Sequence, residues 1–212
     1  MARLKKGLLN GIYGAIGNIE GYELNGQYII RSRRSKSLKP FSEKQLACME
    51  KMRIINGLLS RFSEFVKLGF AETAKDQTFT AYNAAVAYQL THVIAGNYPN
   101  YDIDYSKLRL TEGPISMEGL HPSVSIEGDA LLFSWIPTPD YPNSTDHVML
   151  LAYAPELKQA VYNLCGAKRK TGQEMLELPK AWQQQRIETY LAFRGESNGQ
   201  YGNSIYTGSL IF

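Results

Sequence analysis

The sequence contains few of the residues from which catalytic and metal sites are usually built. It has three histidines, His92, His121 and His147, and each falls in a different predicted element. No serine or cysteine stands in a GxSxG or comparable nucleophile motif, and no Gly-Lys-Ser/Thr follows the N-terminal glycines as a phosphate-binding loop requires. We therefore expect a protein that is not an enzyme and that uses no cofactor or metal ion.

Long apolar runs are also absent, since no stretch approaches the roughly 18 residues that a membrane-spanning helix needs. Basic residues precede the apolar residues 8–12, but Asn10 and several glycines interrupt the continuous apolar stretch of a secretory signal. Cys48 and Cys165 lie far apart, which favours two free thiols in a reducing or redox-indifferent compartment. We expect neither a cleaved leader nor a membrane anchor, and the location is otherwise open, a virion included.

What the sequence does have is an ample apolar content and an uneven distribution of charge. Of its 212 residues, 44% are hydrophobic and 11% are aromatic, which is enough to bury a core. Residues 1–75 carry 14 Lys and Arg against 6 Asp and Glu, a balance of +8, and the remainder carries −5. A polyanion bound to the front half would explain this asymmetry, and so would head-to-tail attraction between copies or ordinary solvated surface charge.

Glycines recur every three or four positions near the start of the chain, at Gly7, Gly11, Gly14, Gly17 and Gly21. Such spacing indicates repeated close approach of backbone to backbone, or repeated positive φ angles. A ribbon follows these glycines and not a helix, so they do not form a dinucleotide-binding fingerprint. Two interpretations remain open: tight packing within the fold, or an assembly arm whose main chain lies against a neighbouring subunit.

Residues 17–34 alternate apolar and polar side chains around Asn25-Gly26, the preferred pair for a type I′ turn, and so predict a two-stranded ribbon. A basic cluster continues from its second strand and is the candidate surface for a polyanion. Its residues are Arg31, Arg33, Arg34, Lys36 and Lys39, with Tyr22 and Tyr28 for stacking on bases. The same cluster would also suit a subunit interface or a solubilising sheet edge.

Two amphipathic helices are predicted after the ribbon. Apolar residues recur at every third or fourth position between residues 42 and 69, where a capping residue and a glycine mark the ends. A second apolar stripe runs from about residue 78 to residue 95. Because the helices are close in sequence, we expect an antiparallel pair that completes a first region, residues 1–104.

From about residue 105 the pattern changes to short β segments separated by Gly, Pro, Asn and Asp. There are seven or eight of them, beginning with Leu108–Leu110, which is the number expected of an antiparallel sandwich. The predicted inner walls are Leu131, Phe133 and Trp135 on one strand and Ile187, Leu191 and Phe193 on another. The predicted fold class is therefore α+β, an N-terminal β-ribbon and antiparallel helix pair followed by an Ig/fibronectin-like β-sandwich at residues 105–212.

Two segments of this last region resemble a fibronectin type III domain. LFSWIP at residues 132–137 is similar to the second strand of that fold, in which a buried Trp is followed by Pro as the strand leaves the sheet. Leu178-Pro179 and the later ETYLAF are similar to its E-to-F passage, with Tyr190 as a candidate tyrosine corner. The resemblance covers residues 105–212 and implies a spacer or binding module rather than an enzyme.

From end to end, the chain also resembles a family of uncharacterised Bacteroidota proteins. The resemblance rests on the opening GIYGAIGNIEGY and the ribbon NGQYIIRSR, followed by KPFSEKQLACMEKM, AYNAAVAYQL and NYPNYDIDYSKL. That family is a domain of unknown function, so the resemblance implies no activity and no catalytic residues.

Together these features favour a non-enzymatic structural or interaction protein that assembles with itself or with a larger complex, such as a phage particle or a cell surface. The glycine-spaced arm offers main chain to a partner, the basic ribbon offers positive charge, and the acidic second half offers a complementary surface. The alternative is sequence-nonspecific nucleic-acid binding through the basic N-terminal half. Neither hypothesis involves a membrane span.

Overall fold

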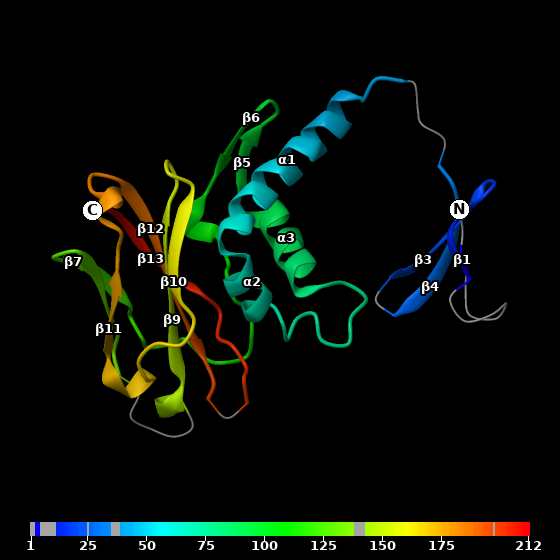
Figure 1. Ribbon diagram of the computed structural model, residues 1–212. Coiled ribbons are helices and arrows are strands. Elements are labelled where there is room, and N and C mark those ends of the chain that lie inside the picture. The colour runs from blue at the N-terminus through cyan, green and yellow to red at the C-terminus, as the bar shows by residue number, and fades with distance from the viewer. Residues whose placement is uncertain (1–2, 5–11, 25, 35–38, 138–142, 197) are drawn as a thin grey trace. The chain divides into compact units, whose positions relative to one another are not determined.

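The computed structural model describes residues 3–4, 12–24, 26–34, 39–137, 143–196 and 198–212 (Figure 1). The chain divides into two compact units, Met1–Glu43 and Lys44–Phe212. This division differs from the boundary expected after residue 104, because the helices share a hydrophobic core with the sheets that follow them. Each unit is described separately below.

The first unit contains a four-stranded antiparallel sheet in the order β1-β2-β3-β4. Its strands are β1 (Arg3–Leu4), β2 (Ile12–Ile16), β3 (Ile19–Leu24) and β4 (Gln27–Ser32). The pairing of Leu24 with Gln27 leaves two residues for the turn, and Gly26 has a φ of +77°. The predicted ribbon is thus confirmed as β3 and β4, and β2 is a further strand that the sequence pattern did not show.

The second unit begins with the helices α1 (Glu43–Leu59), η1 (Ser60–Phe62), α2 (Ser63–Gly69) and α3 (Ala81–His92). The first predicted helix is confirmed over its whole length, although a 3₁₀ turn divides it. Thr80 caps α3 by accepting a hydrogen bond from the backbone N–H of Asn83 at 3.3 Å. Past His92 the chain does not continue as a helix to residue 95, because β5 (Ile94–Asn97) and β6 (Asn100–Ile103) form a hairpin there.

The rest of the second unit forms two antiparallel sheets, one in the order β11-β8-β7 and one in the order β10-β9-β12-β13. The strands are β7 (Ser123–Glu127), β8 (Ala130–Ser134), β9 (His147–Ala154), β10 (Gln159–Asn163), β11 (Gln173–Glu177), β12 (Arg186–Arg194) and β13 (Ile205–Ile211). Each overlaps a predicted segment, whereas Leu108–Leu110 is not a strand. The coarse α+β class is confirmed.

The four-stranded sheet of the second unit is covered on both faces (Figure 1). One face shares a core with β8 and β11, and this core contains all six residues predicted for the inner walls: Leu131, Phe133, Trp135, Ile187, Leu191 and Phe193. The other face packs against the helices, where the Phe62 ring meets Tyr153 edge-on at 5.7 Å and Phe65 meets Tyr162 at 6.1 Å. A boundary after residue 104 would cut through this second core.

Candidate interaction surface

One face of the N-terminal sheet exposes large apolar side chains. The pairing of Ile16 with Ile19, and of Gly21 with Ile30, puts these isoleucines on one face of the sheet, and the pleat adds Tyr28. Their exposed fractions are 56% for Ile16, 50% for Ile19, 52% for Tyr28 and 60% for Ile30. We call these four residues the apolar sheet face.

A glycine pair at Gly14 and Gly21 shapes this face, because the two residues lie opposite each other on β2 and β3 and carry no side chain. Strict alternation from Gly14 would turn Tyr13 to the opposite face. Instead its hydroxyl donates to Glu23 Oε2 at 2.7 Å, and its ring packs edge-on against Tyr28 at 5.6 Å. The φ of +98° at Gly14 interrupts the alternation at that point and brings Tyr13 beside Tyr28.

The glycines predicted as an assembly arm fall partly within this sheet. Gly14 lies in β2, Gly17 occupies the β2–β3 turn with a φ of +58°, and Gly21 lies in β3. Gly7 and Gly11 lie outside the described residues. Gly14 and Gly21 pair with each other within the chain's own sheet, whereas Gly17 has the positive φ that the spacing indicated and nothing within 4 Å of an added Cβ.

The described residues of the predicted basic cluster lie in β4 and just beyond it. Arg31 lies on the face opposite the apolar sheet face, with Nη2 3.1 Å from Glu20 Oε2 and its guanidinium 5.0 Å from the centre of the Tyr22 ring. Its charge is therefore balanced within the sheet. Arg33, Arg34 and Lys39 are exposed beyond β4, whereas Lys36 lies outside the described residues.

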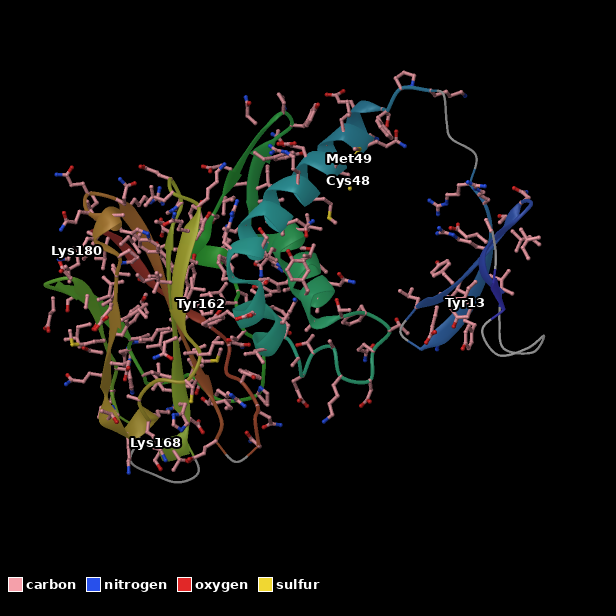
Figure 2. The ribbon with its side chains drawn as sticks, in the orientation of Figure 1. Tyr13, Cys48, Met49, Tyr162, Lys168 and Lys180 are labelled. Atoms are coloured by element: carbon pink, nitrogen blue, oxygen red, sulfur yellow. The ribbon has the colours of Figure 1, made fainter. Side chains whose placement is uncertain are left out.

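A second exposed apolar surface lies on the first turns of α1. Leu46, Met49 and Met52 recur along the helix and are exposed, and the first buried residue of α1 is Ile55. Figure 2 shows Met49 and the thiol of Cys48 on this part of the helix. We call Leu46, Met49 and Met52 the α1 stripe.

The three histidines lie apart, as their separate elements predicted. On α3 the ring of His92 stacks on that of Tyr88, with 4.3 Å between the ring centres. His121 is exposed in a loop and has a φ of +42°. His147 opens β9, and its Nδ1 lies 2.8 Å from the carbonyl oxygen of Gly166. In the part of the chain that the structure describes, no group of three or more His, Cys, Asp and Glu residues could hold a metal ion.

A hollow of about 200 Å³ is lined by a histidine, a thiol and a carboxylate, those of His147, Cys165 and Glu196. His147 Nε2 lies 3.9 Å from Glu196 Oε1, but Lys168 Nζ is closer to that oxygen, at 3.1 Å, and lowers the pKa of Glu196. Cys165 is exposed there, and the described contacts include no hydrogen bond between it and His147. Lys168 is thus the nearer charged partner of Glu196 in this hollow.

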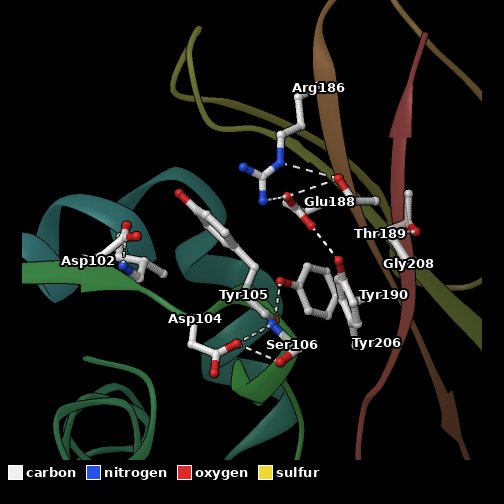
Figure 3. A network of polar contacts seen from close by, with 12 residues as sticks. Asp102, Asp104, Tyr105, Ser106, Arg186, Glu188, Thr189, Tyr190, Tyr206 and Gly208 are labelled. Carbon is white, nitrogen blue, oxygen red and sulfur yellow. Dashed lines mark hydrogen bonds and ion pairs between the residues drawn. The ribbon is translucent and has the colours of Figure 1, made fainter. Parts of the chain in front are cut away.

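A buried polar network holds the sheet to the loop before it (Figure 3). Glu188 is fully buried on β12 and accepts a hydrogen bond from the Tyr206 hydroxyl at 2.7 Å, while Arg186 Nη2 lies 2.6 Å from its other oxygen. Burial, and then the bond to Glu188, raises the pKa of Tyr206 to about 12. Burial likewise raises the pKa of Tyr105 to about 12. Both hydroxyls therefore keep their protons at ordinary pH, and that of Tyr206 donates to Glu188.

The prediction of a tyrosine corner at Tyr190 is wrong. Its hydroxyl donates at 2.8 Å to the backbone carbonyl of Tyr105, 85 residues earlier, in the short helix η2 (Tyr105–Lys107). A tyrosine corner would bond to the backbone a few residues upstream. Tyr190 also belongs to the core beneath the helices, so it anchors the connection from β6 to the sheet.

A family of unknown function (DUF6266) matches residues 11–208 of the chain. The chain belongs to this family. The match begins at the N-terminal sheet and ends within β13, so the DUF6266 pattern spans both units. The expected resemblance to an uncharacterised family is confirmed. No curated protein matches the chain, and no solved structure does either.

Two features of the described surface were not found by reasoning from the sequence. The alternation of Ile16, Ile19 and Ile30 was a usable signal for an apolar face, but it does not say whether that face is covered. Arg109, whose guanidinium lies 4.5 Å from the centre of the Tyr88 ring at the border of a pocket in the second unit, gave no signal, because Leu108–Leu110 resembles a buried strand. Among the described residues, no helix combines the length and the apolar character needed to cross a membrane.

Proposed function

We propose that this DUF6266 protein is a non-enzymatic interaction protein that assembles with copies of itself through the apolar sheet face. The observation that carries the proposal is the exposure of Ile16, Ile19, Tyr28 and Ile30, each by half or more, on one face of a small sheet. Burying a side chain of this size stabilises a complex or a fold by about 1.5–3 kcal/mol. A small sheet needs a covered apolar face to be stable, so a partner surface is expected here.

The α1 stripe of a second copy is the partner surface that we propose. It is apolar and exposed, and it belongs to the unit with the opposite balance of charge. Residues 1–43 carry 8 Lys and Arg against 3 Asp and Glu, whereas residues 44–212 carry 15 against 17. Two basic sheets facing each other would repel, so the charges favour a head-to-tail arrangement.

The second unit serves in this proposal as a rigid carrier with a fibronectin-like sandwich at residues 105–212. Support for that finer description comes from the sheets of three and four antiparallel strands around a shared core, and from the buried Trp135 followed by Pro137. The absent tyrosine corner counts against it. We further propose that the protein is a component of a virion or of a cell-surface assembly and that it comes from a Bacteroidota source.

The test measures the mass of the full chain in solution by light scattering over a range of concentrations, at low and high salt. We expect oligomers that Ile30→Ser weakens by about tenfold, because an exposed apolar contact is lost. Leu24→Ser is the matched control, since Leu24 is 51% exposed on the opposite face of the same sheet. Met49→Gln should weaken assembly as Ile30→Ser does.

A full chain that is monomeric at every concentration and salt, and that binds no subunit of a larger complex, would contradict assembly. Equal weakening by Leu24→Ser and Ile30→Ser would contradict the assignment of the face.

Sequence-nonspecific nucleic-acid binding is the second candidate. The exposed Arg33 and Arg34 beyond β4 favour it, whereas the pairing of Arg31 with Glu20 removes one expected phosphate contact. Titration of labelled DNA and RNA at two salt concentrations tests it, because phosphate binding weakens steeply as salt rises. An absence of binding at low salt would end this hypothesis.

A further inference from the structure

A pocket of about 410 Å³ lies in the second unit, where the C-terminal end of α3 meets η2 and the start of β13. Tyr88 and His92 of α3 form one side, Ser106 and Arg109 another, and Ser204 and Tyr206 a third. Its volume is within the range of pockets that hold small molecules. Tyr206 and Ser106 of the network in Figure 3 border it.

The backbone of Arg109 is held firmly at the wall of this pocket. The fully buried side chain of Gln89 donates to the Arg109 carbonyl and accepts from the Arg109 N–H at 3.3 Å. The next residue, Leu110, donates its N–H to Ser204 Oγ at 2.8 Å. The Arg109 guanidinium lies 4.5 Å from the centre of the Tyr88 ring, and this cation–π contact orients the side chain.

The guanidinium of Arg109 has unused hydrogen-bonding capacity. Its nearest carboxylate is Glu112, whose Oε2 is 3.8 Å from Nη1, and no side-chain hydrogen bond from Arg109 occurs among the described residues. Lys107 Nζ, also at the pocket, lies 3.0 Å from Asp104. Arg109 also borders a second hollow, which is lined by Glu72 and Glu112 and therefore does not suit an anion. An acid group in the pocket could therefore accept two parallel hydrogen bonds from the planar guanidinium of Arg109, one on each of two oxygens.

We propose that this pocket binds a small molecule through a carboxylate or phosphate group held by Arg109. Lys107 also borders the pocket and shares its ammonium group between Asp104 and the ligand, while Ser106 and Ser204 form part of the polar lining. The pocket lies wholly within the second unit and uses neither the apolar sheet face nor the α1 stripe. Ligand binding is thus independent of the proposed assembly.

The test records amide spectra of the isotopically labelled full chain during titration with inorganic phosphate, acetate and, at equal ionic strength, sodium chloride. We expect saturable shifts at the amides of Gln89, Arg109 and Ser204 with phosphate or acetate, and none with chloride. The stronger of the two anions identifies the acid group. Shifts that follow ionic strength alone would overturn the proposal.

Variants separate recognition by Arg109 from general charge. Arg109→Gln should weaken binding by about tenfold, since charge-assisted hydrogen bonds are lost. Arg53→Gln is the matched control, because Arg53 also pairs with a carboxylate three residues away and lies outside the pocket. If Arg109→Gln folds poorly, anion binding is measured on Lys107→Gln instead. Undiminished binding by both pocket variants would contradict the assignment.

Discussion

The N-terminal sheet and the central sheet of the second unit have the same number of strands but opposite surroundings. In the first, Ile16, Ile19 and Ile30 are exposed by half or more. In the second, every residue from Ile187 to Phe193 of β12 is buried, because one face meets a second sheet and the other meets the helices. The comparison shows that the number of layers on a sheet, and not the sheet itself, decides whether its side chains carry stability or recognition.

The number of covering layers also decides whether the polar side chains of each sheet are buried or exposed to solvent. Glu188 is buried in β12 and is satisfied by Arg186, Tyr206 and Ser209, and Thr189 Oγ1 donates to the Gly208 carbonyl at 2.8 Å. A buried polar group without such partners would destabilise the fold. Glu20 and Arg31 of the N-terminal sheet pair in solvent, where an ion pair contributes about 0–1 kcal/mol.

The largest effect is expected from truncation in the doubly covered sheet. Phe193→Ala should lower the free energy of unfolding of the second unit by about 3–5 kcal/mol, because it leaves a cavity beside Trp135. Ile19→Ala, on the exposed face, should cost less than about 0.5 kcal/mol. Urea unfolding followed by tryptophan fluorescence measures the cost of Phe193→Ala, since both tryptophans, Trp135 and Trp182, lie in the second unit, and hydrogen exchange of the β3 and β4 amides measures the cost of Ile19→Ala in the first. Equal costs for the two variants would break the comparison.

Alkaline pH should weaken the second unit next. Burial raises the pKa of Tyr105 and of Tyr206 to about 12, so these hydroxyls keep their protons in the folded state where the unfolded chain loses them near pH 10. The unfolded state then binds fewer protons, and stability falls as the pH rises from about 10 to 12. Tyrosinate absorbance and urea unfolding at several pH values measure this. Stability that stays constant up to pH 12 would show that these tyrosines ionise freely.

A smaller loss of stability is expected from a substitution where the end of α2 packs closely against the loop at Leu110. A Cβ on Gly69, at the end of α2, would lie 2.4 Å from the carbonyl oxygen of Leu110 and 2.8 Å from Thr111 Cα. Gly69→Ala should therefore destabilise the second unit by about 1–3 kcal/mol. Gly57→Ala is the control in the same helical segment, since nothing lies within 4 Å of its added Cβ, and it should stabilise α1 by about 0.5–1 kcal/mol. Urea midpoints of the two variants should move in opposite directions.

The smallest effect on stability is expected from Gly26→Ala, and it should be confined to the N-terminal sheet. Gly26 has a φ of +77° and open space around it, so Gly26→Ala strains the β3–β4 turn by about 1 kcal/mol without a clash. Hydrogen exchange of the β3 and β4 amides should accelerate by several-fold, while unfolding reported by tryptophan stays unchanged. A matching shift in tryptophan-reported unfolding would show that the two units unfold together.

Much of this fold could be predicted from local sequence signals. The Asn-Gly signal at residues 25–26 correctly predicted a turn between β3 and β4, and the alternation around Phe133 and Leu191 correctly identified which side chains form the inner core. The assignment of the helices to the N-terminal ribbon was wrong, because periodicity shows which face of a helix is apolar but not which distant strand covers it. The continuous run of apolar residues at 148–154, VMLLAYA, was the available clue to a third layer, because a strand that is buried on both faces does not alternate.

The candidate sites were less predictable than the fold. Charge density suggested Arg31 as a ligand contact, yet its cross-strand neighbour Glu20 balances it, and that pairing depends on register. Arg109 was missed because its setting is built by Gln89 and Ser204, which are 20 and 95 residues away along the chain. Neither contact leaves a pattern in the local sequence.

The packing of the helices on β9, β10 and β12 also affects how the protein must be made. Phe62 and Phe65 leave the ribosome long before Tyr153, Tyr162 and β12, the surfaces that cover them. At ordinary rates of synthesis this interval lasts on the order of ten seconds. The nascent helices therefore present bare aromatic side chains to chaperones for that time, whereas β3 and β4 can pair as soon as the next few residues emerge.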